Sequence, residues 1–568
     1  MALAEKRPSP EGGSRPRWDP RGSPCVPVRT SAGGTRTLSL TDALRLADPV
    51  PGPGPDPDAG PGPAPPAGSG EYALAVSGAT PGETVALLEY LLAICYRSGC
   101  CPGSDAEWRV WVRDAHPLTR AADWLAQERD EHWDLFHPTE PLGQNALLAP
   151  YLDERGAGPA QLVIEHAGDY NQFFDHHHLE HPVPLAADAA FRAMLTQHAY
   201  GPGGRARISG KDTLGPALTN LAAGRLAGRV RVLALGTSLG DTLRLNLAPT
   251  DSRPAGGAAS DHFNRTWTVS PQPRREFRAK PPGRPVDGPA DLHTLLGRSI
   301  LMRPAVTAGG EPVLAGNGQP AVDRVLLAAG ELLAPLPGHW TQDAVFTTTS
   351  TGTRKPLWPS PSKALWREAH ALYAAVADRD PVGPRTGLWD RLAEMPHRPV
   401  QLWAVGLLAK QTTAISWVAD TFPFIPGREA HLRQAAERGS LIADHLAACL
   451  YRAARAAWKV TYPRSKPADE KDQIARFDAR PEHWAHTAEP FHALLDDTAT
   501  AGGEARVHTA LRVYAATLAL AADRFLHHRL ESLPANSRGF RARSAALGAL
   551  RAGLTAPGAP DELKEEPA

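Results

Sequence analysis

The chain has 568 residues, which is enough for two large domains or for roughly three to four of ordinary size. Hydrophobic residues make up 42% of it and charged residues 21%, so the composition excludes a wholly disordered protein. The 61 basic and 61 acidic residues cancel, which argues against a protein that binds nucleic acid alone through a broad basic face.

The N-terminal part is predicted to contain a tail, a small hairpin and a loop. Residues 1–16 lack an apolar stretch, so we expect a disordered tail and no signal peptide. Val26–Val28 and Thr37–Leu40 predict the two strands of a hairpin. Residues 50–70 are rich in Pro and Gly and predict a loop without regular structure.

The middle of the chain is predicted to mix helices with strands. The apolar density of Glu83–Arg97 predicts a buried helix, and Thr119–Phe136 predicts a second helix with aromatic anchors. Val230–Leu235 predicts a strand, and Asp291–Arg303 predicts a helix followed by a strand. Residues 304–357 are expected to be rich in β-structure.

The last part of the chain is predicted to be helical. After an amphipathic helix at Ser362–Asp378, apolar residues in Arg428–Val460 recur at spacings of three and four and form one helix face. Similar patterns occur in Pro481–Asp496, Arg506–Leu530 and Phe540–Leu554. Several long helices with short breaks between them suggest a four-helix bundle.

We therefore predict an α+β fold, with a large mixed N-terminal domain followed by a C-terminal four-helix bundle. The predicted limits are a tail at 1–16, a mixed domain at 17–385, a connecting segment at 386–424, the bundle at 425–555 and a tail at 556–568. No run of about 18 apolar residues occurs, so no membrane span is expected. The five cysteines contain no CxxC pair, which favours a reducing cytoplasm and no structural zinc.

The most informative stretch joins glycines to basic residues. Its glycines are Gly201, Gly203 and Gly204, and its first bases are Arg205, Arg207 and Lys211. Glycine lets a backbone approach a ligand closely, and arginine and lysine bind phosphates, so the pattern indicates a phosphate-bearing partner. It does not match GxxxxGK[ST], because Asp212 follows Lys211, and it does not match GxGxxG after a strand. A purely structural glycine turn stays an alternative. Four more bases follow: Arg225, Arg229, Arg231 and Arg244.

Two short motifs suggest enzymes and have simpler interpretations. Gly236–Gly240 fits GxSxG after a strand, so an α/β-hydrolase-like serine esterase using Ser238 is the alternative function. No series of βα units surrounds it, which favours a tight turn. His177 and His181 fit HxxEH, but Pro182 follows at once, so a zinc-binding helix is not expected there.

Several segments, taken in order, resemble the CasA family, the large subunit of the type I-E CRISPR surveillance complex (Cascade). The order and spacing of these segments carry the resemblance, since no single motif is specific. The segments are Trp18–Arg29, Trp133–Asn145, His166–His176, Gly201–Arg207, Arg265–Pro304 and Gly406–Trp417.

The resemblance implies a non-catalytic subunit that recognises the protospacer-adjacent motif (PAM) of target double-stranded DNA through the minor groove. It also implies that this subunit starts R-loop formation and helps to recruit a helicase–nuclease. The implied partners are other Cascade subunits with CRISPR RNA and a small-subunit dimer. No cofactor, metal or membrane is implied.

Specific residues follow from the resemblance. Asn171 and Phe174 correspond to a PAM-side loop, and Gln411 to a wedge that separates the strands, flanked by Lys410 and Thr412 in a helix-like segment. The glycines would press the backbone against the groove, while Arg205, Arg207 and Lys211 would hold phosphates. A core anchor at Phe174 and plain polar surface at Gln411 stay alternatives.

One departure from the family concerns its lysine finger. No lysine lies between Lys280 and Lys355. Arg324, Arg354 or Lys355 could take the place of the finger, and the preferred PAM could then differ.

Overall fold

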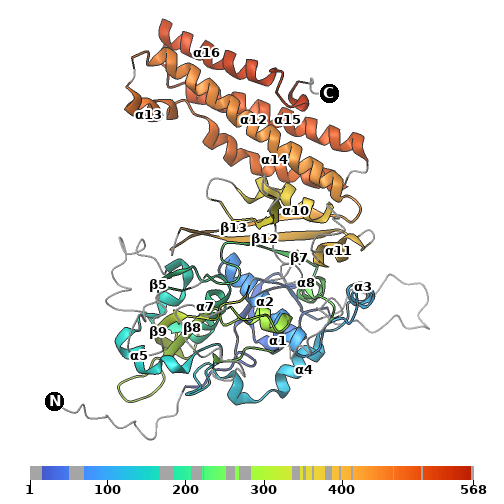
Figure 1. Ribbon diagram of the computed structural model, residues 1–568, viewed down its shortest axis with the longest axis vertical. Coiled ribbons are helices and arrows are strands. Elements are labelled where there is room, and N and C mark those ends of the chain that lie inside the picture. Colours follow the sequence, from blue (N-terminus) through green and yellow to red (C-terminus); the bar gives the residue numbers. More distant parts are fainter. Residues whose placement is uncertain are drawn as a thin grey trace, which may run out of the picture. The chain divides into compact units, whose positions relative to one another are not determined.

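The computed structural model describes most of the chain (Figure 1). The described residues are 16–49, 70–166, 183–205, 220–221, 223–250, 262–267, 283–334, 346–348, 354–360, 364–377, 387–395, 398–410, 413–464, 466–500 and 503–564. Contacts divide the chain into two compact units. The first comprises Met1–Pro361, Pro384–Arg391 and Trp403–Ala419, and the second Ser362–Gly383, Leu392–Leu402 and Asp420–Ala568. The predicted domain limits stay predictions.

The first unit begins with a small antiparallel sheet. Its strands are β1 (Val26–Thr30), β2 (Thr35–Leu38) and β3 (Ala73–Val76), in the order β2-β1-β3. Val26 pairs with Leu38, so the predicted hairpin is confirmed. Helix α1 (Leu40–Arg45) follows, capped by Ser39.

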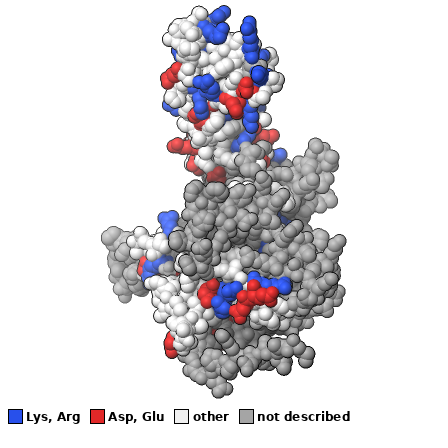
Figure 2. Space-filling view, turned by 90° about the vertical axis from the view of Figure 1, so that its left-hand side faces the viewer, with Lys and Arg blue, Asp and Glu red and all other residues white. Residues whose placement is uncertain are grey.

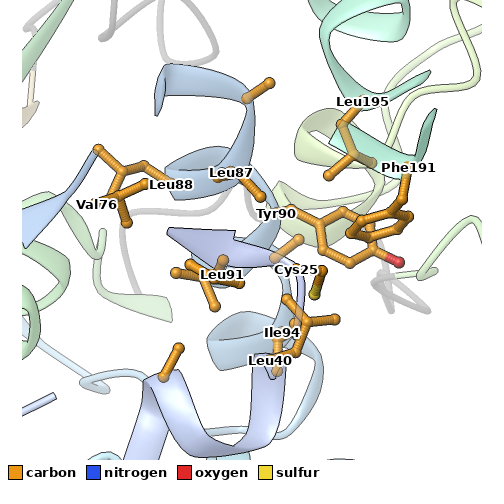
Figure 3. Packing of buried hydrophobic residues seen from close by; sticks show 14 of the residues in the cluster. Cys25, Leu40, Val76, Leu87, Leu88, Tyr90, Leu91, Ile94, Phe191 and Leu195 are labelled. Atoms are coloured by element: carbon orange, nitrogen blue, oxygen red, sulfur yellow. The ribbon is translucent and has the colours of Figure 1, made fainter. Parts of the chain in front are cut away.

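The core of this unit is built around α2 (Pro81–Arg97), the predicted buried helix. Thr80 caps it by accepting a hydrogen bond from the Glu83 amide, and Pro81 suits its first turn. Figure 3 shows side chains of α2, such as Leu91 and Ile94, packed among residues of the surrounding elements. Tyr90 meets Phe191 of α7 (Ala187–Tyr200) edge to face, with ring centroids 5.7 Å apart.

The second predicted helix is shorter than expected. Helix α4 (Thr119–Gln127) ends well before Phe136, and a 3-10 turn at Asp130–Trp133 follows. The buried Arg21 guanidinium donates to the carbonyl oxygens of Leu125 and Glu128, which satisfies acceptors that the end of a helix leaves open. Trp133 is still fully buried, so its predicted role as an anchor is confirmed.

Two further sheets contain the strands that lie near the candidate site. Strands β4 (Leu185–Ala186), β9 (Ala321–Ala329) and β8 (Arg298–Pro304) form one, in the order β4-β9-β8. Strands β13 (Thr413–Phe424), β12 (Val400–Lys410) and β7 (Val230–Leu235) form the other, in the order β13-β12-β7. The strands predicted at 230–235 and after residue 291, and the β-structure within 304–357, are confirmed.

The helix-like segment predicted around Gln411 is wrong. The residues on both sides of it form β12 and β13, which lie side by side (Figure 1). Thr413, Ile415, Trp417 and Val418 are β-branched or aromatic, and such side chains favour a strand over a helix.

The remaining elements of the first unit and of the segments near its limits are short. They are α3 (Asp105–Arg113), α5 (Ala149–Arg155), β5 (Gly204–Arg205), β6 (Asn220–Leu221), α8 (Leu239–Asn246), α9 (Pro289–His293), β10 (Phe346–Thr348), β11 (Arg354–Pro356) and α11 (Gly387–Ala393).

The second unit is mainly helical. Its helices are α10 (Ala369–Ala377), α12 (Glu429–Thr461), α13 (Glu470–Ala475), α14 (Arg480–Thr500), α15 (Glu504–Leu530) and α16 (Ser537–Leu554). Helix α12 packs against α10, α14, α15 and α16. The predicted apolar face of α12 is buried, including Leu432, Ile442 and Leu446. The expectation of sheets in the N-terminal part and helices in the C-terminal part of an α+β chain is therefore confirmed.

Candidate nucleic-acid interface

The glycine stretch starts at the end of α7. Gly201 caps the helix, and its amide donates to the Gln197 carbonyl oxygen at 3.0 Å. Gly201 is buried, and a Cβ there would lie 2.5 Å from that oxygen and 2.7 Å from Arg298 Nη2. Packing inside the protein therefore already requires a glycine at this position. Gly203, two residues on, is only half-buried.

Two buried side chains hold the start of this stretch. Arg298 is 2% exposed and donates to the carbonyl oxygens of Pro202, at 2.7 Å, and Gly297, at 2.8 Å. Burial lowers the pKa of its guanidinium to about 10. His198 Nε2 lies 2.9 Å from the Gly143 carbonyl oxygen, while Nδ1 accepts from the Arg298 amide. Burial lowers the pKa of His198 to about 4, so its ring is neutral at neutral pH.

A short ladder then brings the two ends of the next segment together. In β5 and β6, Gly204 pairs with Leu221 and Arg205 pairs with Asn220. The amide of Gly224 also donates to the Gly201 carbonyl oxygen at 2.8 Å. The two ends of the segment that joins β5 and β6 therefore lie next to each other.

Several predicted site residues lie in this segment or in others outside the described residues. Gly204 and Arg205 are described by their backbone alone. The predicted residues outside the described ranges are Asn171, Phe174, Arg207, Lys211, Gln411 and Thr412, and so are the motif histidines His177 and His181.

The predicted wedge belongs to neighbouring strands. Strand β12 ends at Lys410, of which the backbone alone is described, and β13 begins at Thr413. The two strands are neighbours in one sheet and two residues join them, so they run antiparallel as a hairpin. Gln411 and Thr412 are the residues that join them.

Trp417 of β13 connects the three predicted segments. Its indole Nε1–H donates to the Glu165 carboxylate, which lies just before the segment with Asn171 and Phe174. Its ring meets Tyr200, the residue before Gly201, edge to face with centroids 4.9 Å apart. Trp417 itself lies in the hairpin that ends at Gln411. The described residues next to all three predicted segments therefore lie close together within the first unit.

Three of the later basic residues are interior. The Arg225 guanidinium pairs with the Glu89 carboxylate, and Arg231 Nε lies 2.8 Å from it. Arg244 makes two contacts of 2.7 Å with Asp48. Burial by itself raises the pKa of Glu89, but the charges of Arg225, His293 and Arg231 hold it well below its ordinary value. These arginines therefore neutralise buried or partly buried carboxylates and extend no phosphate-binding surface.

Ser238 is a helix cap. The strand–turn–helix that GxSxG predicts does form, as β7 followed by α8, but Ser238 is 4% exposed. Its Oγ accepts from the Asp241 amide at 3.0 Å and lies 2.9 Å from Asp48 Oδ1, to which it donates. Capping accounts for a serine at this position.

The residues considered as replacements for the lysine finger lie in different strands. Arg324 donates to the carbonyl oxygens of Leu152 and Gly156, while Arg354 and Lys355 belong to β11.

In the described ranges, no three His, Cys, Asp or Glu side chains are grouped so that they could hold a metal ion. The described helices include none that is long and apolar enough to cross a membrane.

Charge on the visible surface is mixed. On the face that Figure 2 draws, basic and acidic side chains of the first unit lie next to one another, and the helical unit carries separate groups of both signs. This face therefore agrees with the zero net charge, which favours a local nucleic-acid site over a broad basic one.

Sequence reasoning missed the residues that join the segments. Trp417 lay inside a quoted segment, but its partners Glu165 and Tyr200 are more than two hundred residues away along the chain. Gly82 of α2 was also missed, although a Cβ at this position would overlap the Trp417 ring. A tryptophan six residues after the predicted wedge was the one available signal.

Known proteins resemble this chain along most of its length. The family model described as CRISPR-associated protein Cse1 matches residues 69–525. A CRISPR-associated protein CasA/Cse1 of Thermus thermophilus is 29% identical over 269 residues, which are 45% of this chain and 49% of the relative. The match thus spans about half the length of that relative.

Solved structures share the fold. The Cse1 of Acidimicrobium ferrooxidans has a TM-score of 0.69 at 21% identity, covering 98% of this chain and 100% of its own. Thermobifida fusca Cse1 has a TM-score of 0.69 at 20% identity, covering 97% and 98%. A chain of a structure called CRISPR RNA-guided surveillance complex has a TM-score of 0.64 at 20% identity, covering 94% and 100%. Because the family model spans well over half of its residues, the chain belongs to the CRISPR-associated Cse1 (CasA) family.

Proposed function

We propose that this protein is a non-catalytic subunit of an RNA-guided antiviral CRISPR complex. It recognises the PAM of target double-stranded DNA through the minor groove, starts R-loop formation and helps to recruit the helicase–nuclease. Membership of the Cse1 family supports this role, and a structure with the same fold comes from a CRISPR RNA-guided surveillance complex. Other Cascade subunits and CRISPR RNA would be its partners in the cytoplasm.

The observation that carries the proposal is a shared scaffold for groove reading and strand opening. The chain leaves the glycine stretch and enters β7, and β7 is the direct neighbour of β12, whose end leads to Gln411. A probe and a wedge that act on one DNA site must keep a fixed separation. Neighbouring strands of one sheet would keep such a separation, which supports the proposal.

The chemistry of the two elements suits the two tasks. Glycine backbone can approach the narrow minor groove, whose degenerate pattern tolerates several PAM sequences. Arg205, Arg207 and Lys211 would hold phosphates, a contribution that salt weakens. Gln411 would enter beside the PAM, where unstacking costs a few kcal/mol per base step. Once the strands part, guide pairing supplies the sequence specificity.

The helical unit has a separate proposed task. We interpret α12, α14, α15 and α16 as the four-helix bundle, with its outer faces available to a small-subunit dimer. Their inner faces are occupied by the core that the helices share.

The wedge is tested by Gln411→Ala in the complex reconstituted with CRISPR RNA. We expect PAM-dependent affinity for duplex DNA to fall about tenfold or more, because unstacking is no longer offset. Gln401→Ala is the matched control, since Gln401 is an exposed glutamine near the other end of the same strand. Equal affinities of the two variants, measured over a PAM library, would contradict the assignment of the wedge.

A further inference from the structure

We propose that Trp417 is a positioning residue that fixes the tip of the β12–β13 hairpin relative to the glycine stretch and to the segment after Glu165. This inference rests on the proposed function. It assigns no DNA contact to Trp417 itself. It states that Trp417 sets the distance between the groove-reading elements and the wedge.

Three different contacts fix the indole. The Nε1–H donates to the Glu165 carboxylate, which sets the direction of the ring plane. The ring meets Tyr200 edge to face at 89°, and Tyr200 is fully buried. The third contact is with α2, where Gly82 leaves room for the ring that no larger residue would leave. A hydrogen bond, an aromatic contact and a steric fit together allow one orientation.

The partners of Trp417 are themselves rigid. Gly82 lies in the first turn of the buried helix α2, behind the cap at Thr80. Tyr200 is the last residue of α7, and Arg298 donates to the carbonyl oxygen of Pro202, two residues on. A shift of Trp417 would therefore have to move α2 or the end of α7, and both belong to the main core.

The hairpin continues past this contact with less support. Ile415 and Ser416 are exposed, and Trp417 is four residues from the start of β13. At about 3.3 Å per residue, the start of β13 lies roughly 13 Å from Trp417. A tilt of about 10° at Trp417 would then move the start of β13 by roughly 2 Å. Displacements of about 1 Å already disturb precisely positioned groups.

The test separates strand opening from DNA binding. Two targets with the same PAM are compared, one fully duplex and one with mismatched bases already open beside the PAM. The complex reconstituted with CRISPR RNA carries Trp417→Phe, which keeps the aromatic ring and removes the Nε1–H. The matched control is Trp403→Phe, since Trp403 lies in β12 and packs against the same core.

With Trp417→Phe, we expect affinity for the duplex target to fall about tenfold and affinity for the opened target to change less than about twofold. Trp403→Phe should leave both affinities within about twofold. Glu165→Leu should act like Trp417→Phe, and the double variant should be no worse than either, because both remove the same hydrogen bond. Glu165→Leu carries the test if Trp417→Phe lowers the melting temperature.

Two results would overturn the inference. In one, Trp417→Phe behaves like Trp403→Phe; in the other, the duplex and opened targets lose affinity equally, as a merely structural role predicts. The proposed function fails in a different way. In that case the wild-type complex shows neither PAM dependence nor any preference for the opened target.

Discussion

Six of the seven basic residues from Gly201 to Arg244 fall into two groups. Arg205, Arg207 and Lys211 follow the glycines in the sequence and are the proposed phosphate ligands. Arg225, Arg231 and Arg244 have side chains that are 5%, 4% and 2% exposed, against buried or partly buried carboxylates. One run of similar sequence thus contains a candidate phosphate-binding group and a structural group. The difference shows that acidic residues far away in the sequence determine whether an arginine is a structural residue or is available to a ligand.

The largest effect that would sharpen this comparison is expected at Glu89. Glu89→Gln leaves Arg225 and Arg231 buried without their counter-charge, and breaking a buried pair costs about 3–5 kcal/mol. We expect a loss of that order in the free energy of unfolding, measured by denaturant titration. Glu154→Gln is the control, because Glu154 is 77% exposed and an exposed pair contributes at most about 1 kcal/mol. A similar small loss at both positions would break the comparison.

The next effect concerns pH and His198, which anchors the start of the glycine stretch. The unfolded chain binds a proton at His198 below a pH of about 6.5, whereas the folded protein binds it only below a pH of about 4. Between these values the unfolded state holds the extra proton, so stability falls as pH falls. The full loss is about 3 kcal/mol.

Denaturant titrations at several pH values check this expectation. His198→Gln should remove this part of the pH dependence, whereas His528→Gln, at a side chain 76% exposed, should leave it in place. An unchanged slope in His198→Gln would show that this histidine is not held neutral.

The glycines themselves provide a third, smaller test. Gly201→Ala would press a Cβ against Gln197 and Arg298, so we expect a stability loss of about 1–3 kcal/mol. Gly203→Asp should leave the melting temperature nearly unchanged and weaken binding of target DNA, because a carboxylate would face phosphates. If both substitutions lowered the stability and neither changed the affinity for target DNA, the whole glycine stretch would have only a structural role.

The smallest effect is expected at Ser238. Removing the cap with Ser238→Ala should cost about 1 kcal/mol of stability, measured by thermal unfolding, and leave DNA affinity unchanged. Ser238→Thr retains a capping oxygen and should recover most of the loss. Loss of an ester-hydrolysing activity in Ser238→Ala would instead support an enzyme.

Sequence patterns predicted what depends on neighbours along the chain. The apolar spacing of Leu432, Ile442 and Leu446 is local, so α12 was predicted almost to its ends, and so were α14, α15 and α16, whereas the short α13 was not predicted. Arg225 and Arg231 pair with Glu89 across 136 and 142 residues, and no local pattern contains that information. The hairpin at Gln411 was mistaken for helix because its neighbour β7 lies far away in the chain.

The β5–β6 ladder has a consequence for exchange between relatives. Gly204–Leu221 and Arg205–Asn220 join the two ends of the intervening segment, so its sequence and length can change without moving either strand. Doubling the length of such a segment adds only about 0.6 kcal/mol of closure entropy. On the proposed function, segments transplanted between these two pairs would therefore give the scaffold a new DNA preference, whether natural variation or protein engineering exchanges them.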